Sequence, residues 1–146
     1  MESSAAQVLA KRNAPVSYLL DTDTCSTPLK SHSVVASRVL QNLGKLHVSV
    51  VTVGELRTWA DRRNASRRRA VDLDLFLQDV DILPVTVDIA NRFGELRAGL
   101  LDQGQPSPDL DLLIAATALV HNLVLVTHNV KDFQSLPGLA LTDWVP

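Results

Sequence analysis

The chain has 146 residues, of which 46% are hydrophobic and 21% charged, and its formal net charge is −2. A chain of this length is expected to form one domain that buries ~68–70% of its unfolded surface. The small negative charge excludes attraction of the whole surface to nucleic acid, although a local basic patch could still bind nucleic acid. No apolar stretch approaches the ~18–20 residues of a membrane span, so no membrane association is expected.

The cysteine content and the N-terminus both bear on the compartment. Cys25 is the single cysteine, which rules out an internal disulfide and suits a reducing environment. The N-terminus lacks the basic start and apolar run of a signal peptide. We therefore expect a cytoplasmic protein in which the weakly patterned residues 1–14 form a flexible tail and residues 15–146 a single domain.

In chain order, the first elements are a strand, a helix and a second strand. Residues 17–20 predict the first strand. Pro28 interrupts the next segment, so a short turn of helix is expected there, followed by a helix over residues 34–43 that Gly44 ends. Residues 47–51 are rich in β-branched side chains and predict a strand.

Two helices and a short strand are predicted next. Thr52 is a suitable N-cap and Glu55 follows three residues later, which matches a capping box and predicts a helix from Thr52 onward. Residues 66–79 predict a second helix. Residues 82–85 predict a short strand, and Pro84 within it indicates an edge position in the sheet.

The remaining pattern predicts two helices separated by a break, and then a last strand. Residues 87–101 are helical in pattern, and Ser107-Pro108 matches an N-cap followed by a proline at the first helical position. The helix that this pair opens is apolar on nearly all sides over residues 112–120, which predicts burial. Residues 123–126 are typical of a parallel strand covered on both faces. Strands that alternate with helices indicate an α/β fold.

Three acidic residues stand in apolar surroundings near the ends of predicted elements. Asp21 closes the first strand, at the carboxyl end where open α/β sheets bind ligands. Glu55 follows the second strand, and Asp111 lies near the start of the buried helix. Burying a carboxylate is costly unless it is paired, protonated or bound to metal. Because a doubly wound sheet brings such junctions together at one edge, we predict that the three acids share a divalent metal.

Each acid also has a purely structural interpretation. Asp111 could compensate the dipole of its helix, an effect worth ~0.3–1 kcal/mol. Asp109 fits that role better, because two positions earlier on a helix it points away from Asp111. Glu55 could be the partner residue of the capping box, and Asp21 and Asp23 could be turn residues. For each residue taken alone, both interpretations remain open.

The types of ligand indicate which metal the acids would hold. Carboxylates with waters suit Mg²⁺ or Mn²⁺, which prefer oxygen ligands in octahedral array, and the four histidines lack zinc-type spacing. Asn129 follows the last core strand at the same end of the sheet, and its carbonyl can ligate a metal but adds no charge. Three formal charges suit one tight ion, because a second ion ~3.5–4 Å away would need further anionic ligands.

Several short segments occur together in one order. They are Leu19-Leu20-Asp21-Thr22-Asp23, Val53-Gly54-Glu55-Leu56, Gly94-Glu95-Leu96-Arg97, Asp111-Leu112-Leu113-Ile114-Ala115-Ala116 and Val126-Thr127-His128-Asn129, with Pro137-Gly138-Leu139 and Trp144 near the C-terminus. Together they resemble the PIN-domain ribonucleases, specifically the VapC-type toxins of bacterial toxin–antitoxin pairs. The resemblance extends over residues 17–146.

The resemblance implies a three-layer α/β/α sandwich on a central parallel sheet and Mg²⁺-dependent cleavage of RNA, usually structured RNA such as tRNA. It also implies a homodimer and inhibition by a cognate antitoxin. Asp21, Glu55 and Asp111 match the family's three acidic positions, and Asn129 falls where many relatives have a fourth acid. We therefore expect these four residues to be catalytic, with the three acids as metal ligands and Asp23 in a supporting role.

Two other functions remain open on the sequence alone. Asp21-Thr22-Asp23 also fits the strand-end Asp-x-Asp of haloacid-dehalogenase-like phosphatases, although Cys25 replaces the usual Thr or Val and the later acids of that family are poorly matched. The second alternative is a non-catalytic PIN-like module for protein binding, against which the three intact acids argue.

A run of arginines is the remaining feature of note. The run consists of Arg57, Arg62, Arg63, Arg67, Arg68 and Arg69. One interpretation is a solvated face with local ion pairs, for example to Asp61. The other is contact with phosphate, because the arginine fork matches phosphate geometry. An acidic segment of an antitoxin would fit the same surface.

Overall fold

The protein is described by a computed structural model over residues 15–30 and 34–146. The predicted tail, residues 1–14, lies outside the described residues. The strands are β1 Tyr18–Leu20, β2 Leu46–Ser49, β3 Asp81–Leu83, β4 Val124–Val126 and β5 Leu141–Thr142. The helices are α2 Thr22–Lys30, α3 Val34–Gln41, α4 Val50–Asp61, α5 Arg67–Gln78, α6 Val87–Asp102, α7 Asp109–His121 and α8 Val130–Phe133.

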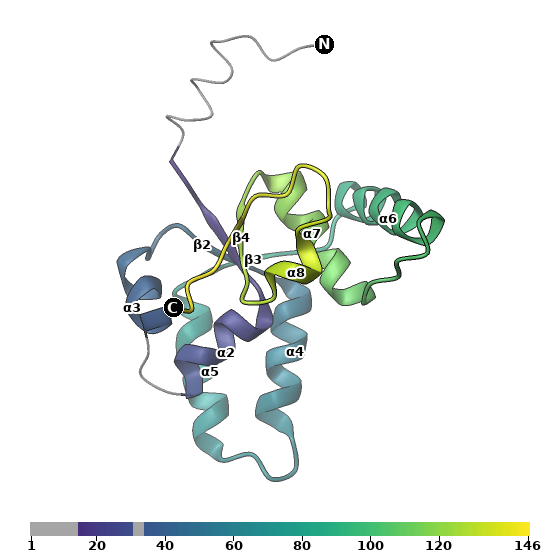
Figure 1. Ribbon diagram of the computed structural model, residues 1–146. Helices are drawn as coiled ribbons and strands as arrows, with labels where there is room; N and C mark the ends of the chain where they lie inside the picture. Colours follow the sequence, from purple (N-terminus) through teal and green to yellow (C-terminus); the bar gives the residue numbers. More distant parts are fainter. Residues whose placement is uncertain (1–14, 31–33) are drawn as a thin grey trace.

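The described strands form one parallel sheet in the order β3-β2-β1-β4-β5, with helices on both faces (Figure 1). Successive residues of a strand point to opposite faces, and β1 shows the division. Leu19 packs in a core with Ile114 of α7, whereas Leu20 packs in the other core with Leu56 of α4. The predicted three-layer α/β/α sandwich is therefore confirmed, and β1 lies at its centre.

Helix α2 is longer than the sequence predicts. The expectation of a short turn limited by Pro28 is wrong, because a nine-residue helix, Thr22–Lys30, runs through that position. Its first turn is anchored by Asp21, whose Oδ1 accepts a hydrogen bond from the Thr24 backbone N–H at 2.8 Å, in the manner of an N-cap. Pro28 lies in the last turn, where its missing N–H removes only one hydrogen bond near the end of the helix.

Helix α4 begins earlier than predicted and follows β2 without a loop. Ser49 is the N-cap, and its hydroxyl accepts a hydrogen bond from the Val51 N–H at 3.1 Å. Thr52 therefore lies inside the helix and is fully buried, so the predicted capping box with Glu55 is wrong. The adjacent valines, Val50 and Val51, extend the β-branched pattern of β2 into the first turn, which is why the predicted strand ran too far.

The other differences are smaller. Helix α7 starts one residue later than expected, with Pro108 rather than Ser107 at the N-cap. Strand β3 takes the predicted edge position and ends directly before Pro84. The sequence predicted neither α8 nor β5, the two-residue strand that pairs with β4 at the other edge. None of the helices in the described ranges is both long and apolar enough to cross a membrane.

The single cysteine lies in the core beneath α2. Cys25 has no exposed surface, and its thiol points toward the Leu20 carbonyl oxygen at 4.0 Å. Burial raises the pKa of this thiol well above its usual range, and the nearby charge of Asp21 raises it further. Cys25 is therefore an inert packing residue rather than a reactive nucleophile.

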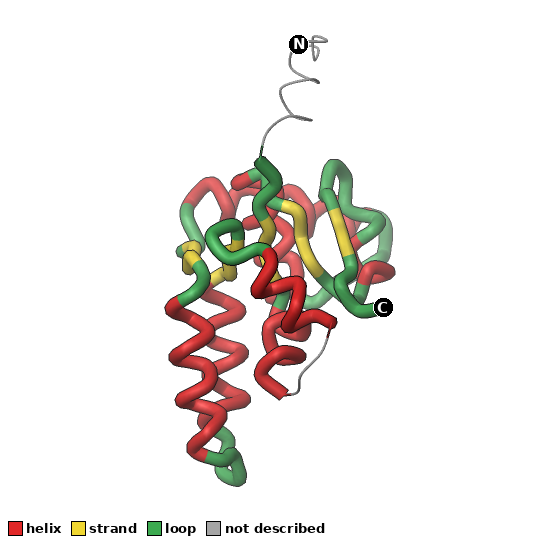
Figure 2. The backbone as a smooth tube through the Cα atoms, turned by 90° about the vertical axis from the view of Figure 1, so that its left-hand side faces the viewer, coloured by secondary structure: helices red, strands yellow, loops and turns green. Residues whose placement is uncertain are grey.

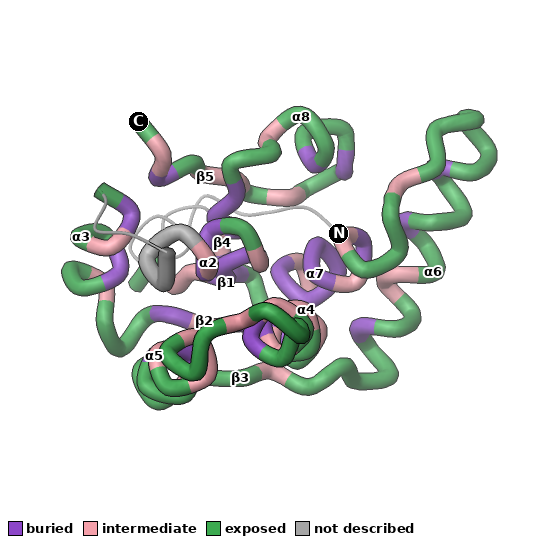
Figure 3. The backbone as a smooth tube through the Cα atoms, turned by 90° about the horizontal axis from the view of Figure 1, so that it is seen from below, coloured by how far each residue is buried: buried purple, intermediate pink, exposed green. Residues whose placement is uncertain are grey.

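Helices α4 and α5 form a hairpin that projects past the carboxyl ends of the strands (Figures 1 and 2). Near the sheet the hairpin is fixed by apolar contacts, because Leu56, Leu73 and Phe76 are buried in the core on that face. The segment that joins the two helices, residues 62–66, is largely exposed (Figure 3).

Candidate metal centre

Asp21 sits at the carboxyl end of the central strand and is only 6% exposed. Its carboxylate is held by the Thr24 N–H and by the side chain of Thr127, the residue that follows β4. Burial raises the pKa of the Asp21 carboxyl, and these hydrogen bonds offset part of that rise. No ion pair to Asp21 occurs among the described residues. The site therefore fixes the orientation of this carboxylate without neutralising its charge.

Glu55 faces the same edge from helix α4. The Thr22 hydroxyl donates a hydrogen bond to Glu55 Oε1 at 2.6 Å, which joins α4 to the start of α2. Because α4 begins at Val50, Glu55 is not placed to cap the helix. Its interpretation as a capping residue is therefore wrong, and its contact with Thr22 directs it toward the junction after β1.

Asp111 is the third residue of α7 and is partly buried. Burial raises the pKa of its carboxyl, and the negative charges of Glu55 and Asp21 raise it further. A residue that served only to compensate the helix dipole would have its pKa lowered. The structure thus brings the three predicted acids into one electrostatic neighbourhood. Asp109 fits the structural role instead, because it is exposed and pairs with Arg97 at 3.1 Å.

Asn129 links the junction after β4 to helix α2. Its backbone N–H donates to Thr127 Oγ1 at 3.0 Å, and its side-chain Nδ2 donates to Asp23 Oδ2 at 3.2 Å. Sequence reasoning missed Thr22 and Thr127, which hold Glu55 and Asp21. The only sequence signal for the two threonines is their position, directly after Asp21 and directly after the last core strand.

The oxygen donors at this edge suit a divalent cation such as Mg²⁺ or Mn²⁺. Within residues 15–30 and 34–146, however, no three Asp, Glu, His or Cys side chains are arranged to hold a metal ion. Two of the carboxylates are directed to other partners: Glu55 to Thr22 and Asp23 to Asn129. The types of oxygen donor therefore fit a divalent cation, whereas the present arrangement of the side chains does not. Metal binding stays a prediction.

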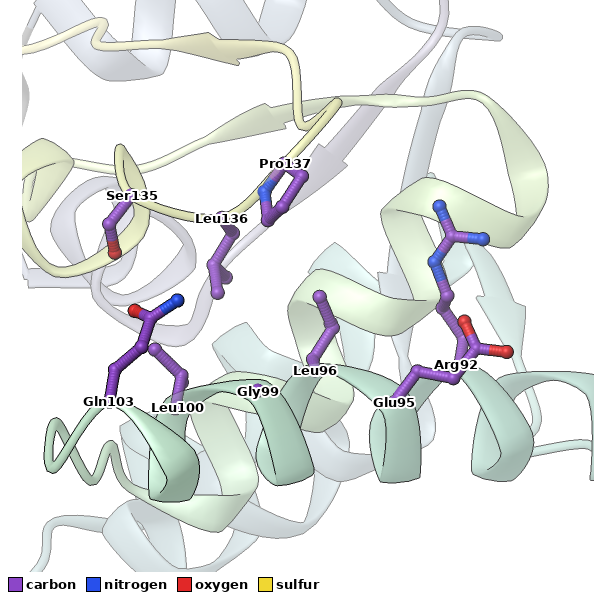
Figure 4. A pocket seen from close by; sticks show the side chains of 9 residues that line it. All are labelled: Arg92, Glu95, Leu96, Gly99, Leu100, Gln103, Ser135, Leu136 and Pro137. Atoms are coloured by element: carbon purple, nitrogen blue, oxygen red, sulfur yellow. The ribbon is translucent and has the colours of Figure 1, made fainter.

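A separate hollow of about 350 Å³ lies between α6 and the segment after α8 (Figure 4). Arg92 and Glu95 stand at one end of it and Gln103 and Ser135 at the other, with leucine side chains between them. The lining of this hollow contains a single carboxylate, that of Glu95. It therefore lacks the several acids that a divalent-metal site requires.

The chain is similar to known proteins over most of its length. A sequence model of the PIN domain matches residues 18–139. The chain is 32% identical over 128 residues to the tRNA(fMet)-specific endonuclease VapC of Shigella flexneri, with 87% of this chain and 97% of the relative covered. It is 34% identical over 130 residues to ribonuclease VapC1 of Haemophilus influenzae strain R2866, with the same coverage.

Solved structures give the same result for the fold. DNA-bound VapBC from Salmonella typhimurium superposes with a TM-score of 0.83 at 29% identity, covering 89% of this chain and 99% of the matched chain. VapBC-1 from nontypeable Haemophilus influenzae gives a TM-score of 0.76 at 33% identity, with 87% and 97% covered. The chain therefore belongs to the PIN domain family, among its VapC-type proteins.

Proposed function

We propose that this chain is a metal-dependent endoribonuclease and the toxin of a type II toxin–antitoxin pair. The observation that carries the proposal is the convergence of Asp21, Glu55 and Asp111 at the carboxyl edge of a PIN-domain sheet. The relatives named as VapC ribonucleases support RNA as the substrate. Membership of the PIN family leaves the haloacid-dehalogenase-like alternative without support.

In this proposal Asp21, Glu55 and Asp111 hold Mg²⁺ or Mn²⁺, which when bound supplies a water of lowered pKa and offsets charge on the phosphate. Asp21 is oriented in advance, because Thr24 and Thr127 fix its carboxylate. Asp111 is repelled by its acidic neighbours, and a bound cation would relieve that repulsion.

Two hydrogen bonds position the rest of the site. The Thr22 hydroxyl holds Glu55 against the start of α2, which places it beside the residue that directly follows Asp21. Asn129 holds Asp23 in the same way, and we propose that Asn129 assists catalysis by positioning this neighbour rather than by ligating the ion.

The partners follow from the relatives. The Shigella flexneri protein is named for a tRNA, which supports structured RNA such as tRNA as the substrate of this chain. The solved neighbours from Salmonella typhimurium and Haemophilus influenzae are VapBC complexes, which supports a cognate antitoxin as protein partner. The family resemblance further supports a homodimer.

The proposal is tested by incubating the purified chain with tRNA and with an unstructured RNA, in Mg²⁺, in Mn²⁺ and in EDTA. We expect cleavage only with metal, and none by an Asp111→Asn variant that retains the native circular dichroism spectrum. Cleavage at the same rate in EDTA would contradict the metal dependence. Tight metal binding with no cleavage of any RNA would favour the non-catalytic protein-binding module.

A further inference from the structure

The end of the α4–α5 hairpin carries charge opposite to that of the rest of the chain. Residues 61–69 contain five arginines and one aspartate, a net charge of +4, in a chain whose total is −2. The remaining residues therefore carry −6. We call residues 59–69 the hairpin tip. This local positive charge is large enough to attract an anion to the tip, although the net charge of the whole protein would repel it.

Some arginines of the run are engaged within the hairpin. Arg57 pairs with Asp74 at 2.6 Å, and Arg68 pairs with Asp72 at 3.2 Å. Arg69 lies across the Trp59 ring, 4.9 Å from its centre, and also donates to the Trp59 carbonyl oxygen at 3.1 Å. These three arginines are therefore part of the hairpin's own structure.

The other three arginines differ. Arg62, Arg63 and Arg67 are exposed and form no ion pair with any described residue. They surround the segment that joins the helices, where the first turn of α5 adds partial positive charge, and the Ser66 N-cap side chain makes no capping bond there. The tip thus presents three free guanidinium groups in one place.

An aromatic surface lies beside these groups. Trp59, Arg62, Arg63, Asn64, Ala65 and Arg69 line a hollow of about 340 Å³. Indole and guanidinium planes are the surfaces on which proteins stack unpaired bases, while arginine forks bind the phosphates. An acidic peptide would use the charges of the tip but gain little from the indole. The combination therefore favours a single-stranded nucleic acid over a protein.

The tip lies on the same side of the molecule as the acids. Glu55 and Arg62 belong to one helix and its end, seven residues apart, which is about 10 Å along the axis at 1.5 Å per residue. The hairpin projects past the carboxyl ends of the strands, where the acids stand (Figures 1 and 2). An RNA strand bound at the acids can therefore reach the tip with neighbouring nucleotides.

We propose that the hairpin tip is a second RNA-binding subsite, in which Arg62, Arg63 and Arg67 hold phosphates and the Trp59–Arg69 pair stacks a base. The inference rests on RNA being the substrate, and it adds that an RNA long enough to span both places binds more tightly than a short one. In this proposal the acids carry out the cleavage. The tip increases the affinity for RNA and fixes which nucleotide lies at the acids.

The first test measures binding without cleavage. A fluorescently labelled single-stranded RNA is titrated in EDTA at several salt concentrations against the native chain and an Arg62→Ser/Arg63→Ser/Arg67→Ser variant. Each phosphate contact in a single strand contributes about 0.7 to the slope of log affinity against log salt, so the variant should lose about 2 from that slope. A control that removes three charges elsewhere, Arg38→Ser/Lys45→Ser/Arg92→Ser, should retain it.

The second test observes the stacking surface directly. The chain has two tryptophans, and Trp144 is buried against Tyr18 away from the tip. In a Trp144→Phe background, Trp59 is the only indole, and RNA should quench its fluorescence. The quenching should disappear when Arg62, Arg63 and Arg67 are replaced. RNA binding that leaves Trp59 emission unchanged would overturn the stacking role.

The outcomes separate this inference from the proposed function. If the native chain cleaves RNA in Mg²⁺ while the tip variant keeps the full salt slope and the full rate on long RNA, only the inference fails. If no RNA is cleaved but the tip still binds RNA in EDTA, only the proposed function fails. Tighter binding of a polyglutamate peptide than of RNA, lost in the tip variant, would overturn the RNA assignment in favour of an acidic protein partner.

Discussion

The acidic edge of the sheet and the hairpin tip are opposite in charge and in environment, although helix α4 contributes to both. The acids are buried or partly buried, and burial raises the pKa of Asp21 and Asp111. Arg62 and Arg63, at the other end of the helix, are exposed to solvent. A buried, uncompensated charge costs stability and therefore needs a functional cause, whereas an exposed charge costs little. The acids are thus the stronger evidence of function.

The largest expected effect is on cleavage by Asp111→Asn. Loss of a residue that merely orients a metal ligand already costs ~10–100-fold in affinity or activity. Loss of a ligand should therefore lower the rate by more than about 100-fold, because Asn keeps the shape but not the charge. Initial rates on tRNA in Mg²⁺ measure the effect, and Asp109→Asn is the matched control on the same helix turn. A rate near that of the native chain would make Asp111 a structural residue.

The same substitution should stabilise the metal-free protein. Burial and neighbouring acids raise the folded-state pKa of Asp111 above its unfolded value of about 3.9. The folded state therefore holds the proton more tightly, and stability falls as pH rises from the unfolded to the folded pKa. Asp111→Asn avoids that loss, so its melting temperature in EDTA at pH 7 should be higher than that of the native chain.

Two further measurements check the origin of that gain. Well below the unfolded pKa of about 3.9 the carboxyl is protonated in both states, so the advantage of Asp111→Asn should vanish there. Asp109→Asn should show no gain at neutral pH, because Asp109 is exposed and pairs with Arg97. A destabilised Asp111→Asn variant at pH 7 would mean that the charge of Asp111 is already compensated in the folded protein, and the contrast between the two regions would disappear.

Asn129→Asp should have an intermediate effect, on metal stoichiometry. If the three acids hold one ion in the native chain, as we propose, neutral Asn129 supplies no charge for a second. In the native chain Asn129 Nδ2 lies 3.2 Å from Asp23 Oδ2, so the new aspartate would face the Asp23 carboxylate. The repulsion between these two carboxylates should strengthen binding of a second Mn²⁺. Calorimetric titration of the RNA-free protein measures this, with Asn129→Ala as a charge-neutral control. Two equally tight ions in the native chain would refute the single-ion account.

The smallest effect is expected for the ion pairs of the hairpin. Arg57 and Asp74 lie 2.6 Å apart, but their side chains are 40% and 59% exposed. Exposed pairs contribute ~0.2–1 kcal/mol, so a double-mutant cycle with Arg57→Ala and Asp74→Ala in urea should give a coupling free energy in that range. A coupling above that range would give these exposed charges a structural role and weaken the comparison with the acids.

Much of the fold follows from local patterns in the sequence. The alternation of strands and helices predicted the α/β sandwich, and Pro84 predicted the edge strand. The start of α4 did not follow, because Ser49 and Thr52 are both good N-caps and the valines between them suit a strand as well as a helix. Strand β5 has two residues and forms only by pairing with β4, so no local pattern exists for it.

The candidate site was likewise predictable from the sequence only in part. Asp21 and Asp111 could be identified because a carboxylate next to an apolar run is an unusual local pattern. The contacts that hold the acids could not be predicted, since Thr22 and Glu55, like Thr127 and Asp21, lie far apart in the sequence and meet only after the sheet has formed. The sequence also could not show which arginines lack an ion pair, because that depends on how α4 packs against α5.

Because Cys25 is buried, its reaction with a labelling reagent can report local opening of the protein. Only the thiolate reacts with alkylating reagents, and the Cys25 thiol is enclosed one helical turn from Asp21. Labelling therefore requires an opening of the structure that exposes helix α2, which begins directly after Asp21. The labelling rate of the unmodified chain thus reports how often the structure opens beside the acidic edge, without any engineered probe.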